Sequence, residues 1–126
     1  MTAIAIHHAS VLVRDLERAR LFYEEILGLK VNKDRPSKTF DGLWYDVGSS
    51  QIHLIVTDQF DLPEESALYP GVRRHVALRV PDLQAIGERL GDHQLPVFPS
   101  SSGRPVLFCR DFDGNAFELI GEEPNR

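Results

Sequence analysis

The sequence predicts an α+β protein built from two successive modules, each with the element order β-α-β-β-β. Apolar, β-branched segments alternate with stretches whose apolar residues recur at helical spacing, and this order is the same in both halves. Short motifs also recur between the halves in constant register. We expect a single domain over residues 1–126, with module one at about 1–57, a linker at about 58–72 and module two at about 73–121.

The composition is that of a globular protein without strong charge bias. The chain has 126 residues, 42% of them hydrophobic, and a formal net charge of −5. This length can bury a core, and the negative charge gives no reason to expect nucleic acid or an anionic membrane as a partner. The single cysteine, Cys109, excludes an intrachain disulfide, and neither a signal peptide nor a membrane span is visible. We expect a cytoplasmic protein.

The first module begins with an apolar strand, followed by Asp15 as a candidate helix N-cap. Apolar residues from Leu16 to Leu27 fall near i, i+3, i+4 spacing, which predicts an amphipathic helix that ends at Gly28. Gly48, Ser49 and Ser50 indicate a turn. The expected strands cover residues 4–13, 29–33, 43–47 and 51–56.

A polar segment at 57–71 leads to the second module. Its helix is expected to open at Pro81-Asp82-Leu83 and to end near Gly91, and residues 111–115 have strong turn chemistry. The expected strands cover residues 74–80, 95–98, 106–110 and 116–121.

The two modules align in sequence over two stretches. Residues 8–16 match residues 75–83 at a constant offset of 67, with His, Val, Asp and Leu coinciding. Residues 46–55 match residues 111–120 at an offset of 65, with Asp, Leu and Ile coinciding. The small change of offset requires only a small difference in loop length. We interpret the pattern as a duplicated module.

Four metal-competent side chains occupy equivalent places in this repeat. His8 pairs with His75 on the first strand of each module, and His53 pairs with Glu118 on the last strand. On each strand the apolar residues alternate with the candidate ligand, so the ligand faces away from the core. A pseudo-two-fold axis would bring the four together if these strands line a shared cleft. Any single histidine is usually an ordinary polar residue, so the prediction depends on the four positions being in register.

Three imidazoles and one carboxylate suit one divalent ion such as Zn, Ni, Co, Fe(II) or Mn. The sequence therefore predicts a metal site formed by His8, His53, His75 and Glu118. His7 is expected to point to the opposite face of its strand. Cys109 is expected to be a small core residue, because no histidine lies near it in sequence.

These motifs resemble the vicinal oxygen chelate superfamily, which includes glyoxalase I, fosfomycin-resistance thiol transferases, extradiol dioxygenases, methylmalonyl-CoA epimerase and bleomycin-resistance proteins. The resemblance implies a glyoxalase-like fold, in which two βαβββ modules form a cupped mixed sheet around a metal cleft. It implies the same four ligands and a homodimer, sometimes with the site between chains. The segments that carry the resemblance are residues 6–16, 22–29, 51–54, 74–83 and 111–119.

The ligand set departs from particular members of that superfamily at His53. Bacterial glyoxalase I commonly has a carboxylate there, whereas fosfomycin enzymes and extradiol dioxygenases use three ligands that match His8, His75 and Glu118. Bleomycin-resistance proteins usually lack the ligands, which disfavours a metal-free binding role. The position of His53 therefore leaves the choice among the enzymes open.

The expected function is that of a metal-dependent glyoxalase-type lyase or isomerase. It would act on a small molecule with vicinal oxygens through an enediolate, with Glu118 as the catalytic base. A thiol transferase, an extradiol dioxygenase and a non-catalytic small-molecule or metal-binding protein are the alternatives. The candidate substrate-binding residues are Ser10, Trp44, Gln51, Arg79 and Phe108.

For Trp44 and Phe108, ordinary core packing is the favoured alternative to substrate binding. The polar segments at 58–71 and 99–104 are candidate lids. Arg73, Arg74 and Arg104 could meet an anionic substrate, although a solvated surface position is the simpler expectation for each.

Overall fold

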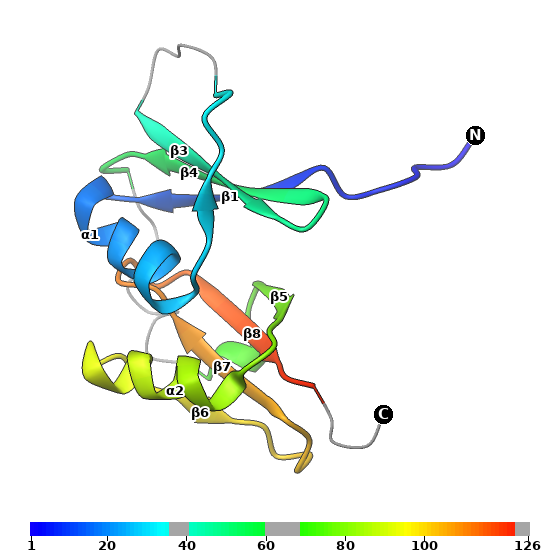
Figure 1. Ribbon diagram of the computed structural model, residues 1–126, viewed down its shortest axis with the longest axis vertical. Helices are drawn as coiled ribbons and strands as arrows, with labels where there is room; N and C mark the ends of the chain where they lie inside the picture. The colour runs from blue at the N-terminus through cyan, green and yellow to red at the C-terminus, as the bar shows by residue number, and fades with distance from the viewer. Residues whose placement is uncertain (36–40, 60–68, 123–126) are drawn as a thin grey trace. The chain divides into compact units, whose positions relative to one another are not determined.

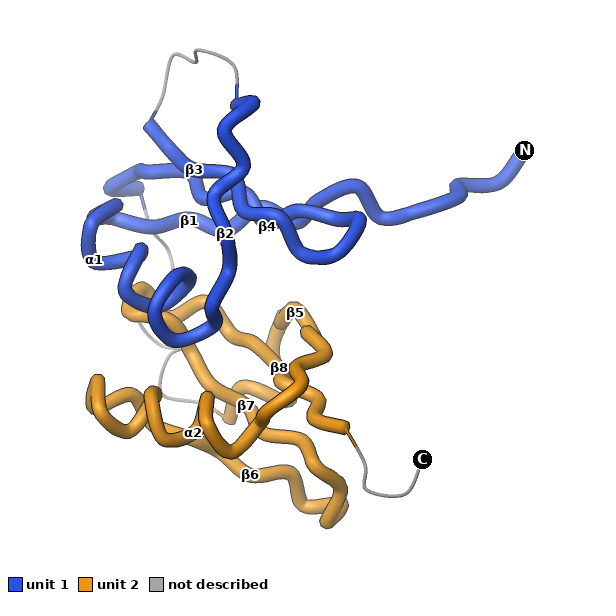
Figure 2. The backbone as a smooth tube through the Cα atoms, in the orientation of Figure 1, with its two compact units in different colours: residues 1–60 blue, residues 61–126 orange. Residues whose placement is uncertain are grey.

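The computed structural model describes residues 1–35, 41–59 and 69–122. It divides the chain into two compact units, residues 1–60 and 61–126, each with its own four-stranded mixed sheet (Figure 1, Figure 2). The expected linker and the first candidate lid lie largely outside the described residues. No helix in the described ranges has the length and apolar character needed to cross a bilayer.

The sheet of the first unit has the strand order β1-β4-β3-β2. The edge strand β1 pairs with β4 in parallel, and the other two pairs, β4–β3 and β3–β2, are antiparallel. Its strands are β1 (His8–Val13), β2 (Lys30–Val31), β3 (Gly42–Val47) and β4 (Ser50–Val56).

The helix of the first unit begins where the sequence predicts. The Asp15 side chain caps α1 (Leu16–Arg20) by accepting a hydrogen bond from the Arg18 backbone N–H at 3.1 Å. The helix continues through a wider, π-helical stretch, η1 (Leu21–Ile26), and Gly28 then turns the chain with φ of +73°. The buried ring of Tyr23 packs on Tyr45 of β3, which holds the helix against the sheet.

The second unit repeats this arrangement with the strand order β5-β8-β7-β6. Asp82 caps its helix, α2, by accepting a hydrogen bond from the Ala85 N–H at 3.0 Å. A short 3₁₀ turn, η3 (Pro70–Val72), precedes β5 and packs on β7 and β8. The remaining elements are β5 (His75–Arg79), α2 (Leu83–Asp92), β6 (Phe98–Pro99), β7 (Val106–Arg110) and β8 (Ala116–Ile120).

Strand register confirms that the modules are structural repeats. His53 lies opposite Ser10 across the β1–β4 pair, and Glu118 lies opposite Ala77 across the β5–β8 pair. With His8 and His75 each beginning its strand, the two histidines occupy equivalent positions. The last strands and the first strands of the two units therefore correspond as the sequence alignment predicts.

The alignment is wrong on the strand before the last one. Asp46 faces Gln51 in the first unit, but the residue that faces the corresponding Ala116 is Arg110. The second hairpin is one residue longer, and the extra residue lies in its turn. There the carboxylate of Asp111 accepts hydrogen bonds from the backbone N–H groups of residues 113 and 115, which stabilises the longer turn.

Five strands are shorter than expected, with β5 one residue shorter at each end and β8 one residue shorter at its C-terminal end. The ladder of β1 begins at His8, opposite Gln51, and the His7 carbonyl accepts a hydrogen bond from the Gln51 N–H at 3.1 Å. The Ile6 carbonyl accepts from the side-chain hydroxyl of Ser50 at 2.8 Å, at the turn where β4 begins. The second strand shrinks to two residues, and β6 covers 98–99 instead of 95–98. The α+β class and the two βαβββ modules are confirmed.

Candidate functional site

In the second unit, the structure brings His75 and Glu118 together. His75 Nδ1 lies 2.8 Å from the backbone carbonyl oxygen of Arg73, to which it donates a hydrogen bond. His75 Nε2 lies 3.1 Å from Glu118 Oε1, and each of the two side chains is 25% exposed. The Arg73 carbonyl therefore places the proton of a neutral imidazole on Nδ1 and the lone pair on Nε2.

This contact has the geometry of two ligands on one cation. A lone pair that faces a carboxylate oxygen at 3.1 Å is repulsive unless a proton or a metal ion lies between them. Zinc-type ions bind imidazole nitrogen and carboxylate oxygen at about 2.0–2.1 Å, so adjacent ligands at a right angle lie roughly 3 Å apart. A backbone carbonyl that holds the other ring nitrogen is also the usual support of a metal-bound histidine. His75 and Glu118 thus fit a divalent ion.

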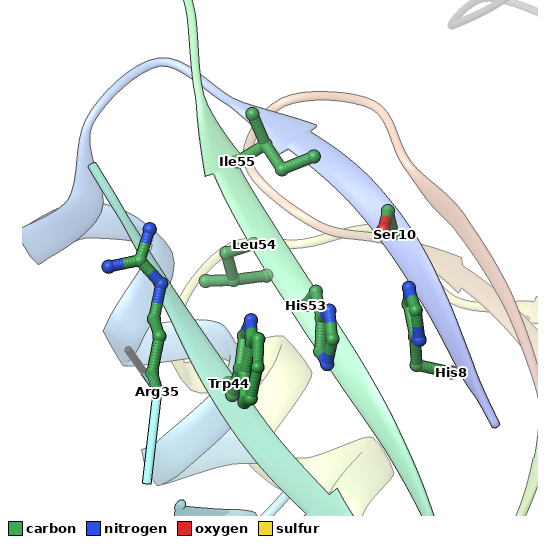
Figure 3. Close-up of a pocket in the computed structure, with 7 residues that line it drawn as sticks. All are labelled: His8, Ser10, Arg35, Trp44, His53, Leu54 and Ile55. Carbon is green, nitrogen blue, oxygen red and sulfur yellow. The ribbon is translucent and has the colours of Figure 1, made fainter. Parts of the chain in front are cut away.

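In the first unit, His8 and His53 lie together in a different way. Their rings are stacked with centroids 3.8 Å apart and planes 13° apart. The indole of Trp44 stacks on the other face of His53, at 4.3 Å and 8°. Trp44, His53 and His8 therefore form an aromatic row across β3, β4 and β1 (Figure 3).

Polar neighbours hold both imidazoles of this row. His53 is 7% exposed, and its Nε2 lies 2.7 Å from Oε1 of Gln51, which accepts the hydrogen bond. His8 Nδ1 lies 2.9 Å from His7 Nδ1, so one of these two rings donates to the other. The expectation that His7 points away from His8 is wrong, because His7 precedes the paired strand and its ring is free of strand alternation.

The nitrogen lone pairs of the two stacked imidazoles, His8 and His53, do not point at a common metal position. Ring nitrogens carry their lone pairs in the plane of the imidazole, so near-parallel planes direct the lone pairs of His8 and His53 side by side. Binding one ion through both would require at least one ring to rotate. Consistent with this, no group of three or more His, Cys, Asp or Glu side chains across the described ranges is arranged to hold a metal ion.

The candidate substrate-binding residues have different surroundings. Ser10 and Trp44 line a pocket of about 290 Å³ in the first unit. Gln51 holds His53, Arg79 is exposed on β5, and Phe108 is buried with its ring at the edge of His75 at 5.5 Å. Core packing therefore describes Phe108 and not Trp44. The complete pocket lining is His8, Ser10, Arg35, Trp44, His53, Leu54 and Ile55 (Figure 3).

Two features of the site escaped the sequence analysis. Trp44 lies opposite His53 and Phe108 lies opposite Glu118, so each module has an aromatic residue beside its candidate ligand on the last strand. Because the second hairpin has one extra residue, the alignment at an offset of 65 does not place Trp44 over Phe108. The other is Arg35, which reaches the pocket from the connection after β2 and belongs to no motif.

The cysteine takes no part in this site. Cys109 is fully buried, and burial, followed by the charge of Asp111, raises the pKa of its thiol to about 12. A neutral, inaccessible thiol is neither a nucleophile nor a metal ligand. The expectation that Cys109 is a core residue is confirmed.

Comparisons with known proteins agree with the fold. MhqA of Bacillus subtilis (strain 168), named as a candidate ring-cleaving dioxygenase, is 29% identical over 140 residues. The alignment covers all of this chain but 43% of MhqA, so the chain spans less than half of that relative.

Two solved structures share the fold over nearly the whole chain. TnmS3, an antibiotic-binding protein from Streptomyces sp. CB03234, has a TM-score of 0.67 and 27% identity, with 98% of this chain and 99% of that chain covered. A variant of the fosfomycin resistance protein FosX from Listeria monocytogenes, in complex with Mn(II) and 1S,2S-dihydroxypropylphosphonic acid, has a TM-score of 0.73 and 17% identity. That comparison covers 98% of this chain and 95% of the other.

A family model then covers most of the sequence. It is the model of the Glyoxalase/Bleomycin resistance protein/Dioxygenase superfamily, and it matches residues 5–119. With the duplicated βαβββ topology, this match shows that the chain belongs to the glyoxalase/bleomycin resistance protein/dioxygenase superfamily.

Proposed function

We propose that the chain is a metal-dependent enzyme, a glyoxalase-type lyase or isomerase for a small molecule with vicinal oxygens. The observation that supports this most is the contact of His75 Nε2 with Glu118 Oε1 at 3.1 Å, with His75 Nδ1 held by the Arg73 carbonyl. His8 and His53 complete the proposed ligand set. FosX, whose fold is similar, binds Mn(II) with a vicinal diol, which agrees with a substrate of this kind.

A divalent ion held by these residues would polarise a substrate carbonyl and make the neighbouring C–H acidic. Glu118 is the group in the set that can take up the proton. Its Oε1 faces His75, its side chain is 25% exposed, and Oε2 can therefore reach a substrate. In an isomerisation, the carboxylate would accept the proton from one carbon and return it to the adjacent carbon.

The role of Glu118 can be tested by solvent-deuterium exchange into hydroxyacetone, which has vicinal oxygens and exchangeable protons. We expect exchange with the metal-loaded protein and none above background after chelation. Glu118→Gln should lower the exchange rate by roughly 10²–10⁴-fold, the usual contribution of a general base. Glu88→Gln, an exposed carboxylate on α2, is the matched control. Full exchange by a Glu118→Gln protein that still holds metal would exclude Glu118 as the base.

A second candidate function is ligand binding without turnover. Two observations favour it. The stacking of His8 on His53 leaves their lone pairs side by side. TnmS3, whose fold is similar, is an antibiotic-binding protein. The exchange experiment separates the two functions, because a binding protein would give no metal-dependent exchange with any vicinal hydroxy ketone. Thiol consumption and oxygen uptake would identify the transferase and dioxygenase alternatives.

A further inference from the structure

The pocket of the first unit has one positively charged wall. Arg35 is the only permanently charged side chain among the described residues that line it, and no carboxylate is among them. Figure 3 shows the Arg35 guanidinium at one end of the aromatic row and His8 and Ser10 at the other. A ligand in this pocket would therefore meet a cation at one end and imidazole and hydroxyl groups at the other.

The Arg35 guanidinium lies beside the start of β3. Its Nη2 is 3.4 Å from where a Cβ on Gly42 would stand, which is an ordinary van der Waals distance, whereas the same Cβ would collide with the backbone carbonyl oxygen of Leu54. Arg35 is half-buried, and an ionic hydrogen bond is stronger at such a site than in bulk water.

From this arrangement we infer that the pocket binds the acid group of the substrate, a carboxylate or phosphonate, through Arg35. The hydroxyl or carbonyl oxygens of the same molecule would then lie toward His8 and His53. The inference rests on the proposed function, since it assigns the substrate of the same site. A volume of about 290 Å³ is at the lower end of small-molecule pockets, which favours a small acid.

The negative net charge of the protein gives the Arg35 cation added importance for binding an acid. At −5 the chain as a whole does not attract anions, and charges farther than about 8–10 Å are screened at physiological salt. Recognition of a small acid therefore has to come from a cation in direct contact with it. Arg35 supplies a planar, bidentate donor that matches carboxylate and phosphonate oxygens.

Trp44 makes the inference directly measurable. It is the only tryptophan of the chain, it lines the pocket, and it stacks on His53, so its fluorescence reports on this pocket alone. Three probes share a hydroxyl and differ in the neighbouring group: 2-hydroxypropanoate, 1-hydroxyethylphosphonate and propane-1,2-diol. Titrations would be run on the full chain with and without Mn(II), whose uptake is measured separately by electron paramagnetic resonance.

We expect at least one of the two acids to bind roughly tenfold or more tightly than the diol, and the stronger acid identifies the acid group. Arg35→Ala should lower the affinity for that acid by roughly 10–100-fold while leaving Mn(II) affinity and diol binding unchanged. Arg35→Lys should retain part of the affinity because the charge remains. Arg18→Ala, an exposed arginine on α1 of the same unit, is the control and should bind like the wild type.

The outcomes separate this inference from the proposed function. Mn(II) uptake combined with equal binding of acids and diol, or with no effect of Arg35→Ala, would overturn the inference and leave the metal proposal standing. Acid binding that depends on Arg35 in a protein that takes up none of Zn, Ni, Co, Fe(II) and Mn would support the inference and remove the metal proposal.

Discussion

A single backbone carbonyl decides the chemistry of His75. Because Arg73 accepts the Nδ1 proton, the neutral form of the ring has its lone pair on Nε2, the nitrogen that faces Glu118. A solvated histidine has no such fixed tautomer. His8, at the equivalent position of the first module, shares a hydrogen bond with the His7 imidazole through Nδ1. The Nδ1 atoms of the two equivalent histidines therefore have different partners.

His75→Ala should therefore weaken metal binding more than any change on the protein surface. Loss of second-sphere groups typically costs 10–100-fold in metal affinity, so loss of a ligand should cost roughly 100-fold or more. His93→Ala, at the end of α2, is the matched control and should leave the affinity unchanged. Metal titration of the three proteins is the measurement, and equal affinities would exclude His75 as a ligand.

Cys109 permits a prediction on pH. Its pKa is raised from 9.0 to about 12 in the folded protein, so the unfolded chain releases the thiol proton at lower pH than the native chain. The stabilising effect is complete below pH 9 and is lost as pH rises toward 12. We expect the free energy of unfolding to fall over this range, and to fall less steeply in Cys109→Ala. Denaturant titrations at pH 8 to 11 measure this difference, and parallel pH profiles would contradict it.

At the scale of elements, the sequence predicted the parts whose cause is local. Both helix caps, both helices and the alternation of strands β1, β4, β5 and β8 follow from neighbouring residues. The start of β1 depends on its pairing with Gln51 of β4, and the failure of Asp46 to align with Asp111 depends on the extra residue in the second hairpin. Arg35 reaches the pocket from a connecting segment. None of these is encoded in a short window of sequence.

The two caps should contribute equally, because they occupy the same position in the repeat. Asp15→Ala and Asp82→Ala each remove one side-chain acceptor from a helix N-terminus and should each lower the free energy of unfolding by about 1 kcal/mol. Asp15→Asn and Asp82→Asn keep an acceptor and should cost less. Chemical denaturation measures all four variants. A cap variant as stable as the wild type would show that this hydrogen bond does not support the helix.

A hydrogen bond between η1 and β3 in the first unit leads to another prediction. Tyr45 Oη donates to Glu24 Oε2 at 2.8 Å, and burial followed by this bond raises the pKa of Tyr45 well above its usual range. Tyr45→Phe should lower the free energy of unfolding by about 1–2 kcal/mol, since a hydrogen bond to a charged group is lost from a buried ring. Arg20 stays on Glu24, so no carboxylate is left without a partner. A Tyr45→Phe protein as stable as the wild type would argue against a role of the Glu24 bond.

At the scale of the molecule, each unit brings together one histidine-containing pair. The pair of the second unit has ligand geometry, and that of the first unit is stacked. Sequence symmetry predicted which positions of the two modules correspond, His8 to His75 and His53 to Glu118, because strand register follows from the repeat. It did not predict their orientation, which depends on Trp44, Gln51 and the backbone at Arg73.

We propose that this chain holds a divalent metal ion through His8, His53, His75 and Glu118. The most direct measurement is elemental analysis of protein purified without added metal and after reconstitution, for the wild type, His8→Ala and His75→Ala. We expect close to one ion per wild-type chain and strong loss in both variants. A wild-type protein that takes up no divalent metal would contradict it.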